Sequence, residues 1–132
     1  GTYVLCFDIV GLMRINDDIS REAGDKVILE SLKRINAAAG EDMPVLRIGG
    51  DEFVMVTGLD DVDEVTKIAK AVMAKNGIET AYKGGTVPVS IRSGAVMIRK
   101  PLKYSMLCHD FDEVISFARN DGEVHFAQAE QK

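Results

Sequence analysis

Apolar and polar residues follow one another along this chain in patterns that predict both strands and helices. Residues 2–10, TYVLCFDIV, are almost continuously apolar and rich in β-branched and aromatic side chains, which is typical of a strand covered on both faces. A helical pattern follows from the capping cluster at 16–18 to about Ala39, and Gly40 marks its expected end. The apolar positions of this helix are Ile28, Leu29, Leu32 and Ile35. The chain is therefore expected to begin with a central strand and a long helix.

The middle of the chain predicts a hairpin followed by a second helix. Residues 44–48 and 52–57 are short apolar strands joined by a turn with two glycines, and residues 60–76 have the spacing of an amphipathic helix. The other expected elements are an edge strand, a long strand and a third helix, over residues 78–82, 87–98 and 110–120. This βαββαβ order with additions predicts an α/β protein, an α+β sandwich in which helices pack on a central, mostly antiparallel sheet of the ferredoxin-like or palm kind.

Length and composition narrow the class of protein further. A chain of 132 residues, 46% of them apolar, fits one domain over residues 1–132, and no run approaches the roughly 18 apolar residues that a membrane span needs. The net charge of −5 argues against a nucleic-acid partner held through its phosphate backbone. Cys6 and Cys108 lie far apart without a metal-ligand spacing, so a reducing cytosol is the expected compartment.

Two acidic residues are expected to meet at one edge of the sheet. A right-handed crossover from the first strand makes the next strand parallel to it, so Asp8 at a strand end and Asp51 on the hairpin tip should converge, with Glu52 beside them. Carboxylates in this arrangement can hold one or two Mg²⁺ ions against a triphosphate. The alternative is a plain hairpin with solvated acids, and spacing alone favours that alternative.

Glycine and helix residues near these acids suggest a bulky ligand. Gly49 and Gly50 predict a turn of positive φ in which the backbone can approach a nucleotide closely. Asp25 falls in line with Leu29 on the helix face expected to enter the core, where a carboxylate could accept hydrogen bonds from guanine, and Asn16 could donate and accept along the same base edge. The alternatives, favoured from the residues alone, are a capping role for Asn16 and a partly exposed helix acid at Asp25.

Several of these residues form a pattern that resembles a known family. Residues 47–53, Arg-Ile-Gly-Gly-Asp-Glu-Phe, resemble the RxGGDEF signature of diguanylate cyclases, the GGDEF family. Asp8-Ile9 together with Asn16-Asp17 resembles the family's DxDxFKxxND motif. Ala23-Gly24-Asp25 resembles its GHxxGD motif, and residues 112–122 resemble its ADxALYxAKxxGRN motif. The resemblance covers nearly the whole chain, which looks cut just before the first core strand because the family's opening helix and DxLTGLxNR segment are missing.

The resemblance implies an activity, a cofactor and partners. Two GTP-loaded domains of a homodimer would condense two GTP into cyclic di-GMP, with Mg²⁺ or Mn²⁺ as the cofactor. Asp8, Asp51 and the Ile9 carbonyl would ligate the metal, Asp51 and Glu52 would be catalytic, and Glu52 would serve as a ligand or as the base for the 3′-hydroxyl. The domain would be cytoplasmic, joined to sensory or regulatory domains in a full-length protein, and the cytoplasmic domain of a membrane-tethered protein is one form this could take.

The resemblance also implies substrate contacts. Asn16 and Asp25 would read guanine, Gly49 and Gly50 would lie along the nucleotide, and Arg119 would replace a phosphate-binding lysine.

Some positions depart from the family pattern. Val10 and Met13 stand where the family has an aspartate and a phosphate-contacting lysine, and Glu123 replaces an arginine. Residues 40–43, Gly-Glu-Asp-Met, lack the RxxD of the product-inhibition site. These departures leave open a degenerate GTP-binding or dimerisation module without cyclase activity. A palm-type enzyme with another nucleotide preference is a third possibility.

Overall fold

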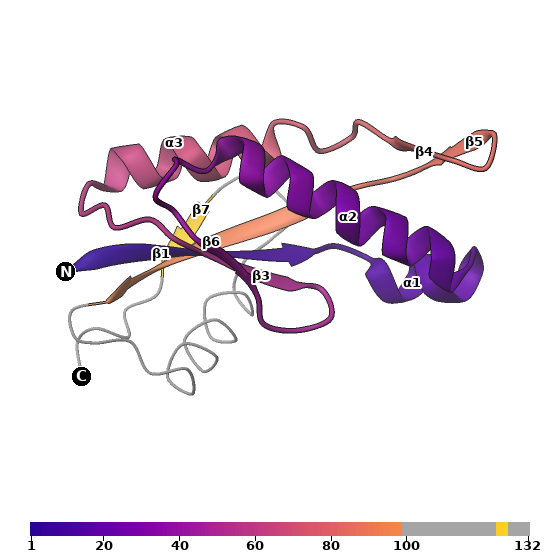
Figure 1. Cartoon of the computed structure of the whole chain (residues 1–132), viewed down its shortest axis with the longest axis horizontal. Helices are drawn as coiled ribbons and strands as arrows, with labels where there is room; N and C mark the ends of the chain where they lie inside the picture. The colour runs from indigo at the N-terminus through magenta and orange to yellow at the C-terminus, as the bar shows by residue number, and fades with distance from the viewer. Residues whose placement is uncertain (99–123, 127–132) are drawn as a thin grey trace.

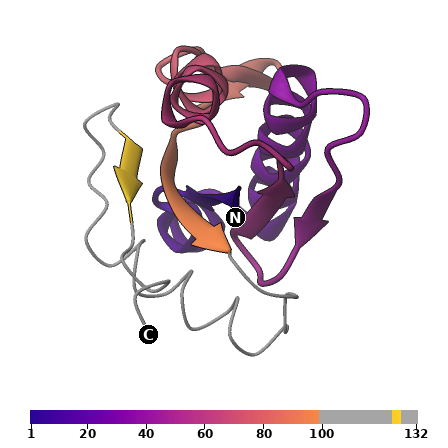
Figure 2. The same ribbon diagram turned by 90° about the vertical axis from the view of Figure 1, so that its left-hand side faces the viewer.

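A five-stranded sheet with helices packed on one face forms the body of the protein (Figures 1 and 2). The computed structural model describes residues 1–98 and 124–126. Its elements in chain order are β1 (Thr2–Ile9), α1 (Leu12–Asp18), α2 (Arg21–Ala38), β2 (Val45–Arg47), β3 (Glu52–Val56), α3 (Val62–Met73), β4 (Thr80–Tyr82), β5 (Gly85–Val87), β6 (Ile91–Ile98) and β7 (Val124–Phe126). The strand order in the main sheet is β2-β3-β1-β6-β7. The expected fold class, helices on a mostly antiparallel sheet, is confirmed.

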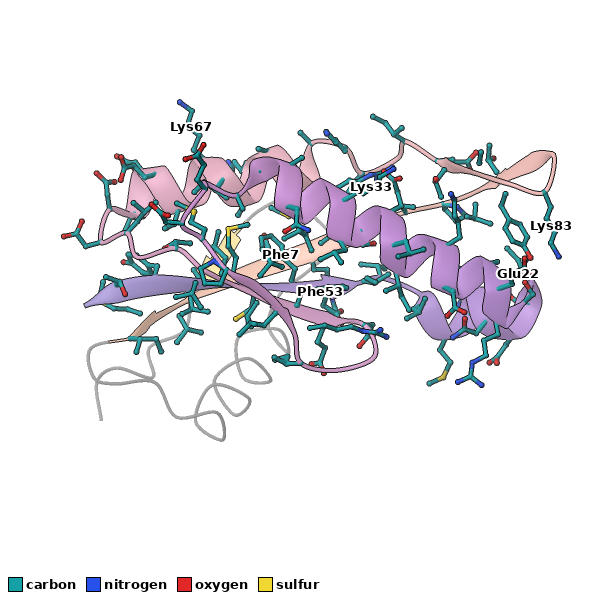
Figure 3. All side chains as sticks on the ribbon, in the orientation of Figure 1. Phe7, Glu22, Lys33, Phe53, Lys67 and Lys83 are labelled. Atoms are coloured by element: carbon teal, nitrogen blue, oxygen red, sulfur yellow. The ribbon has the colours of Figure 1, made fainter. Side chains whose placement is uncertain are left out.

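Strand β1 is the central strand and is buried on both faces. It pairs antiparallel with β3 on one side and β6 on the other, so that Leu5 lies between Met55 and Ala95. Alternate residues of β1 face the helices and the opposite side of the sheet, and both sets are buried. Phe7 and Phe53 lie between the sheet and α2 (Figure 3). This burial explains the continuous apolar run at the start of the sequence.

The long helix begins later than expected. Ser20, not the cluster at 16–18, caps α2, because its hydroxyl oxygen accepts a hydrogen bond from the Ala23 amide at 3.0 Å. The expected capping cluster lies instead in the short helix α1, which Leu12 and Ile15 anchor in the core. A buried pair of apolar residues thus overrides the capping tendency of the acids and asparagine that follow.

The region between α3 and β6 differs most from the expected order. The expected edge strand is β4, but it pairs with β5 in a separate two-stranded sheet rather than extending the main one. Lys83 and Gly84, with φ of 44° and 78°, form its two-residue turn. The expected long strand is divided into β5 and β6 around Pro88, which has no amide hydrogen for a sheet hydrogen bond.

The remaining expected elements are confirmed where they can be assessed. The β2–β3 hairpin pairs Arg47 with Phe53, and Asp61 caps α3 by accepting from the Asp63 amide at 2.7 Å. The expected helix over 110–120 lies outside the described residues. None of the helices in the described part of the chain is long and apolar enough to cross a bilayer.

Candidate functional site

Asp8 and Asp51 lie together where β1 ends and the β2–β3 hairpin turns. The strands run as expected, since β2 and β1 are both antiparallel to β3 and therefore parallel to each other. The Ile9 amide donates a hydrogen bond to the Asp51 main-chain oxygen at 2.9 Å, which fixes the hairpin tip against the end of β1. The convergence of these two acids at one edge of the sheet is thus present.

A residue that the sequence pattern did not single out completes this edge. Arg92 lies directly across from Asp8 in the pairing of β6 with β1. Its Nε donates to Asp8 Oδ2 at 3.0 Å, and its Nη2 bonds the same oxygen. The only advance signal was a charged residue within the otherwise small and apolar strand IRSGAVMI.

Burial and neighbouring charges act on Asp8 in opposite directions. Its side chain is 8% exposed, and this desolvation raises the pKa of the carboxyl more than any other influence. The Arg92 guanidinium lowers the pKa, while the nearby Asp51 carboxylate raises it again. The net result is a raised pKa for Asp8, which means that ionising this carboxyl costs more free energy in the folded chain than in the unfolded chain.

The Gly49–Gly50 turn has a different geometry from the one expected. Neither glycine is among the positive-φ residues of the described chain, so a left-handed conformation is not the reason for glycine here. Close approach is the reason at Gly49, because a Cβ added there would lie 2.2 Å from Glu52 Oε1. A Cβ at Gly50 would meet nothing within 4 Å. Gly49 therefore provides the space in which the Glu52 carboxylate lies.

Arg47 holds this turn through hydrogen bonds to its backbone carbonyls. Its Nε donates to the Gly49 carbonyl at 3.1 Å and its Nη2 donates to the Gly50 carbonyl at 2.7 Å. The Ile48 amide donates to the Glu52 carbonyl at 2.9 Å and closes the hairpin. The backbone of the turn is thus fixed by the chain's own hydrogen bonds.

The expected guanine-reading residues come from two helices that touch. Asn16 lies on α1, and its side chain covers Gly24 on α2 so closely that an added Cβ would be 1.7 Å from Asn16 Oδ1. Asp25 is the next residue of α2, and both polar side chains are exposed. The argument from the core face was wrong, because Leu29, in line with Asp25, is 62% exposed.

Other residues from the sequence analysis lie apart from this edge or outside the structure. Met13 is 77% exposed on α1. Arg119 and Glu123 lie outside the described residues, and the description of the acidic edge does not include them.

The carboxylate oxygens at this edge are the type of ligand atom that Mg²⁺ prefers. Mg²⁺ prefers hard oxygen ligands and is usually held by one or two carboxylates together with water and substrate phosphates, rather than by a cage of protein side chains. Asp8 and Asp51 supply such carboxylates, and their mutual repulsion at Asp8 favours a cation between them. Within the described part of the chain, no group of three or more acidic, histidine or cysteine side chains is arranged so that it could hold a metal ion.

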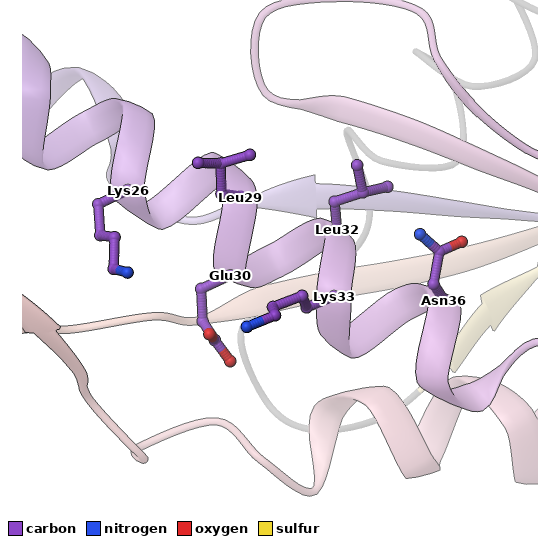
Figure 4. A pocket seen from close by; sticks show the side chains of 6 residues that line it. All are labelled: Lys26, Leu29, Glu30, Leu32, Lys33 and Asn36. Atoms are coloured by element: carbon purple, nitrogen blue, oxygen red, sulfur yellow. The ribbon is translucent and has the colours of Figure 1, made fainter.

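A hollow of about 290 Å³ runs along α2 (Figure 4). All its lining residues belong to that one helix, and they are Lys26, Leu29, Glu30, Leu32, Lys33 and Asn36. The hollow shares no residue with the acidic edge.

The sequence comparison identifies the class. A family model described as "Diguanylate cyclase, GGDEF domain" matches residues 1–125. Together with the paired acids beside the Gly-Gly turn, this match shows that the chain belongs to the GGDEF domain family.

Particular relatives extend the comparison. The GGDEF domain of TpbB, also called YfiN, from Pseudomonas aeruginosa is 26% identical, with a TM-score of 0.82 over 98% of this chain and 81% of that one. The active GGEEF domain of a diguanylate cyclase from Vibrio cholerae shares the fold, with 16% identity and a TM-score of 0.75 over 94% of this chain and 81% of that one. An uncharacterized membrane protein of Staphylococcus aureus is 25% identical over 125 residues, which are 90% of this chain and 35% of that protein. The chain thus spans about a third of the length of the curated relatives it matches.

Proposed function

We propose that this domain binds GTP and, as a homodimer, condenses two GTP molecules into cyclic di-GMP. The observation that carries the proposal is the convergence of Asp8 and Asp51 beside the Gly49–Gly50 turn in a chain of the GGDEF family. In each half of the reaction, the 3′-hydroxyl oxygen of one GTP attacks the α-phosphorus of the GTP on the partner domain. The bond from that phosphorus to pyrophosphate breaks, and pyrophosphate leaves.

The acids would bind and prepare the triphosphate. Asp8, Asp51 and the main-chain carbonyl of Ile9 would hold Mg²⁺ or Mn²⁺, whose chemistry is to offset the negative charge of the phosphates. Glu52 would receive the proton of the attacking hydroxyl or serve as a further ligand. Gly49 and Gly50 would lie along the nucleotide, and their lack of side chains supports a close approach.

Guanine would be read by the two touching helices. Asn16 can donate to and accept from the base edge, and Asp25 can accept from its N1 and N2 donors. The contact of Asn16 with Gly24 supports this assignment, because it holds the amide against the residue of α2 that precedes Asp25. Arg119 is proposed to contact a phosphate.

Regulation by attached or associated proteins belongs to the same proposal. Among the structural neighbours, SiaD of Pseudomonas aeruginosa is complexed with its activator SiaC, and the GGDEF domain of DgcB from Caulobacter crescentus is complexed with cyclic di-GMP. The much greater length of the Staphylococcus relatives supports further sensory or regulatory domains here. A cytoplasmic position follows from the use of GTP.

One observation favours a second candidate, a GTP-binding regulatory or dimerisation module without cyclase activity. Arg92 already neutralises Asp8, and the exposed Met13 offers no positive charge to a phosphate. Charge-assisted hydrogen bonds to phosphate are worth about 1.5 to 3 kcal/mol each, so lost cations weaken substrate binding.

Product formation distinguishes the two candidates. The chain is incubated with GTP and Mg²⁺, and cyclic di-GMP is measured by chromatography against an Asp51→Ala control. Product that the control lacks supports the cyclase. Calorimetric GTP binding that depends on Asp8 and Asp25, without product, supports the regulatory module, and absence of both rejects a GTP-dependent role.

A further inference from the structure

Arg92 is the one feature of the acidic edge that neither the proposed reaction nor the sequence pattern accounts for. It lies on β6 opposite Asp8, and two nitrogens of its guanidinium bond the same carboxylate oxygen, Oδ2. That carboxylate belongs to the proposed metal site. The chain therefore carries its own cation, the Arg92 guanidinium, at a position where a divalent ion is expected.

We infer that Arg92 is a built-in competitor of the divalent cation: it binds Asp8 Oδ2 and releases this oxygen when a polyphosphate binds the guanidinium. Asp8 Oδ2 cannot serve two guanidinium nitrogens and a metal ion at normal bonding distances at once. The like charges of the guanidinium and the ion also repel each other. Metal binding through Asp8 Oδ2 thus requires Arg92 to move.

The geometry permits this movement. Arg92 is 31% exposed, and its bonds at the site are made by the side-chain head, so the head can leave while β6 stays paired with β1. Arg34 is a useful contrast within the same chain. It is 4% exposed and its guanidinium donates to the carbonyls of Lys75 and Ile78, which fixes it between α2 and the segment after α3. Arg92 is therefore exchangeable where Arg34 is structural.

A phosphate group is the natural second partner for the released guanidinium. The planar fork of arginine matches phosphate oxygens as well as carboxylate oxygens, and such pairs are charge-assisted. The identification of this partner as GTP rests on the proposed function, whereas the competition between Arg92 and the metal does not.

Direct measurement of Mn²⁺ binding tests the inference. The metal-free full chain is titrated with Mn²⁺ and free ion is counted by electron paramagnetic resonance, for the wild type, Arg92→Ser and Lys67→Ser. Lys67 lies on α3 and points away from the sheet (Figure 3), so its variant controls for the loss of one positive charge. We expect Arg92→Ser to bind Mn²⁺ roughly tenfold tighter or more than the wild type, and Lys67→Ser to differ little.

Two further arms separate the possible outcomes. The double variant Asp8→Asn with Arg92→Ser should lose the gain, because the gain belongs to Asp8. A non-hydrolysable GTP analogue should narrow the difference between wild type and Arg92→Ser. Equal or weaker Mn²⁺ binding by Arg92→Ser, or a gain that survives Asp8→Asn, overturns the inference. If Arg92→Ser does not fold, as judged by circular dichroism, Arg92→Gln is measured in its place with the same criteria.

This test is independent of the reaction. Tighter Mn²⁺ binding by Arg92→Ser supports the competition even when no cyclic di-GMP forms. Conversely, a wild-type chain that forms cyclic di-GMP while Arg92→Ser binds Mn²⁺ no tighter keeps the proposed function and rejects the competition.

Discussion

Gly49 and Gly50 are adjacent and chemically identical, but the structure assigns them different tasks. A Cβ at Gly49 would displace the Glu52 carboxylate, and one at Gly50 would enter open space. We expect Gly49→Ala to lower cyclic di-GMP formation about tenfold or more, because small displacements of a reacting group are costly. The unfolding free energy should change by less than about 1 kcal/mol, since the displaced atoms are the flexible end of a side chain.

Gly50→Ala is the matched control for this experiment, with product formation measured by chromatography and stability by urea unfolding. A Cβ added at Gly50 would meet nothing within 4 Å. A larger loss of product in Gly50→Ala than in Gly49→Ala would show that contact with the nucleotide, and not the position of Glu52, determines the need for glycine in this turn.

Gly24 offers a second test at the residue scale, because Gly24→Ala should weaken GTP binding without lowering the stability of the helix. Gly24→Ala adds a Cβ where Asn16 Oδ1 now lies, so the Asn16 side chain must turn away from its position against Gly24. Loss of one hydrogen bond to guanine corresponds to roughly three- to tenfold weaker GTP binding in calorimetry. Alanine also raises helix propensity by up to about 1 kcal/mol, so the helix should not be weakened.

Lys26→Ala, an exposed change on the same helix, serves as the control for Gly24→Ala. GTP binding should be unchanged in this control. Unaltered GTP binding by Gly24→Ala would remove Asn16 from the set of guanine-reading residues.

Asp8 makes the stability of the domain depend on pH. Its pKa in the folded chain is raised above the ordinary value of 3.8, chiefly by burial, with Asp51 adding to the rise and Arg92 opposing it. The folded chain therefore holds the Asp8 proton more tightly than the unfolded chain does, and ionisation of Asp8 destabilises the fold. As pH rises above 3.8, the wild type should lose unfolding free energy relative to Asp8→Asn.

The measurement is urea unfolding of the wild type and Asp8→Asn at several pH values, with a chelator present. Their difference should reach a plateau once Asp8 is fully ionised. A difference that moves the other way with pH would mean that the bond to Arg92 outweighs burial.

These residues also show how far sequence reasoning reached. The convergence of Asp8 and Asp51 was predictable because chain direction follows from the crossover rule. Arg92 was missed because pairing across antiparallel strands depends on register, which strand patterns do not reveal. The reason given for Asp25 failed because Leu29 is exposed, so the helical wheel alone assigned it to the wrong face.

At the scale of elements, Arg34 joins α2 to the segment after α3. Its buried guanidinium donates to the carbonyls of Lys75 at 3.0 Å and Ile78 at 2.6 Å, and it pairs with Glu30 at 3.1 Å. We expect Arg34→Met to lower the unfolding free energy by about 2 to 4 kcal/mol, because buried hydrogen-bonding groups lose a charged partner. Urea unfolding measures this loss.

Lys33→Met is the neighbouring control, since this side chain is exposed on the same helix (Figure 3). It should change the unfolding free energy by no more than about 0.5 kcal/mol. Equal effects of the two variants would mean that helix composition, rather than the bonds of Arg34, is responsible.

Element boundaries followed the sequence where local signals agreed, and departed where tertiary contacts decided. Helix α3 begins close to the expected residue 60, and Asp61 caps it through amides that are its neighbours in the chain. The β4–β5 hairpin was not foreseen as a separate sheet. Its position depends on a distant contact, the 2.7 Å hydrogen bond between Tyr82 and Ser20.

At the scale of the whole molecule, stability is expected to be uneven. The amides of β1 lie in the centre of the main sheet and pair on both sides, whereas β4 and β5 pair only with each other. In hydrogen exchange, β1 should be among the slowest segments and the β4–β5 hairpin among the fastest of the described strands. Exchange at equal rates in both would contradict this distribution.

Sheet order was the least predictable global property. The pattern of strands and helices sufficed for the fold class, but the parallel pairing of β7 with β6 joins segments far apart in the chain. Such long-range pairing is decided by the folding of the whole domain rather than by any local pattern.

The grip of Arg47 on the carbonyls of Gly49 and Gly50 has a consequence for the thermodynamics of ligand capture. A glycine-rich loop usually loses much conformational entropy when it becomes ordered around a ligand. Here that freedom is already lost in the folded chain, so a nucleotide arriving at the turn need not freeze it. Ordering of this loop should therefore add only a small entropic penalty to nucleotide binding, in contrast to binding by a flexible loop.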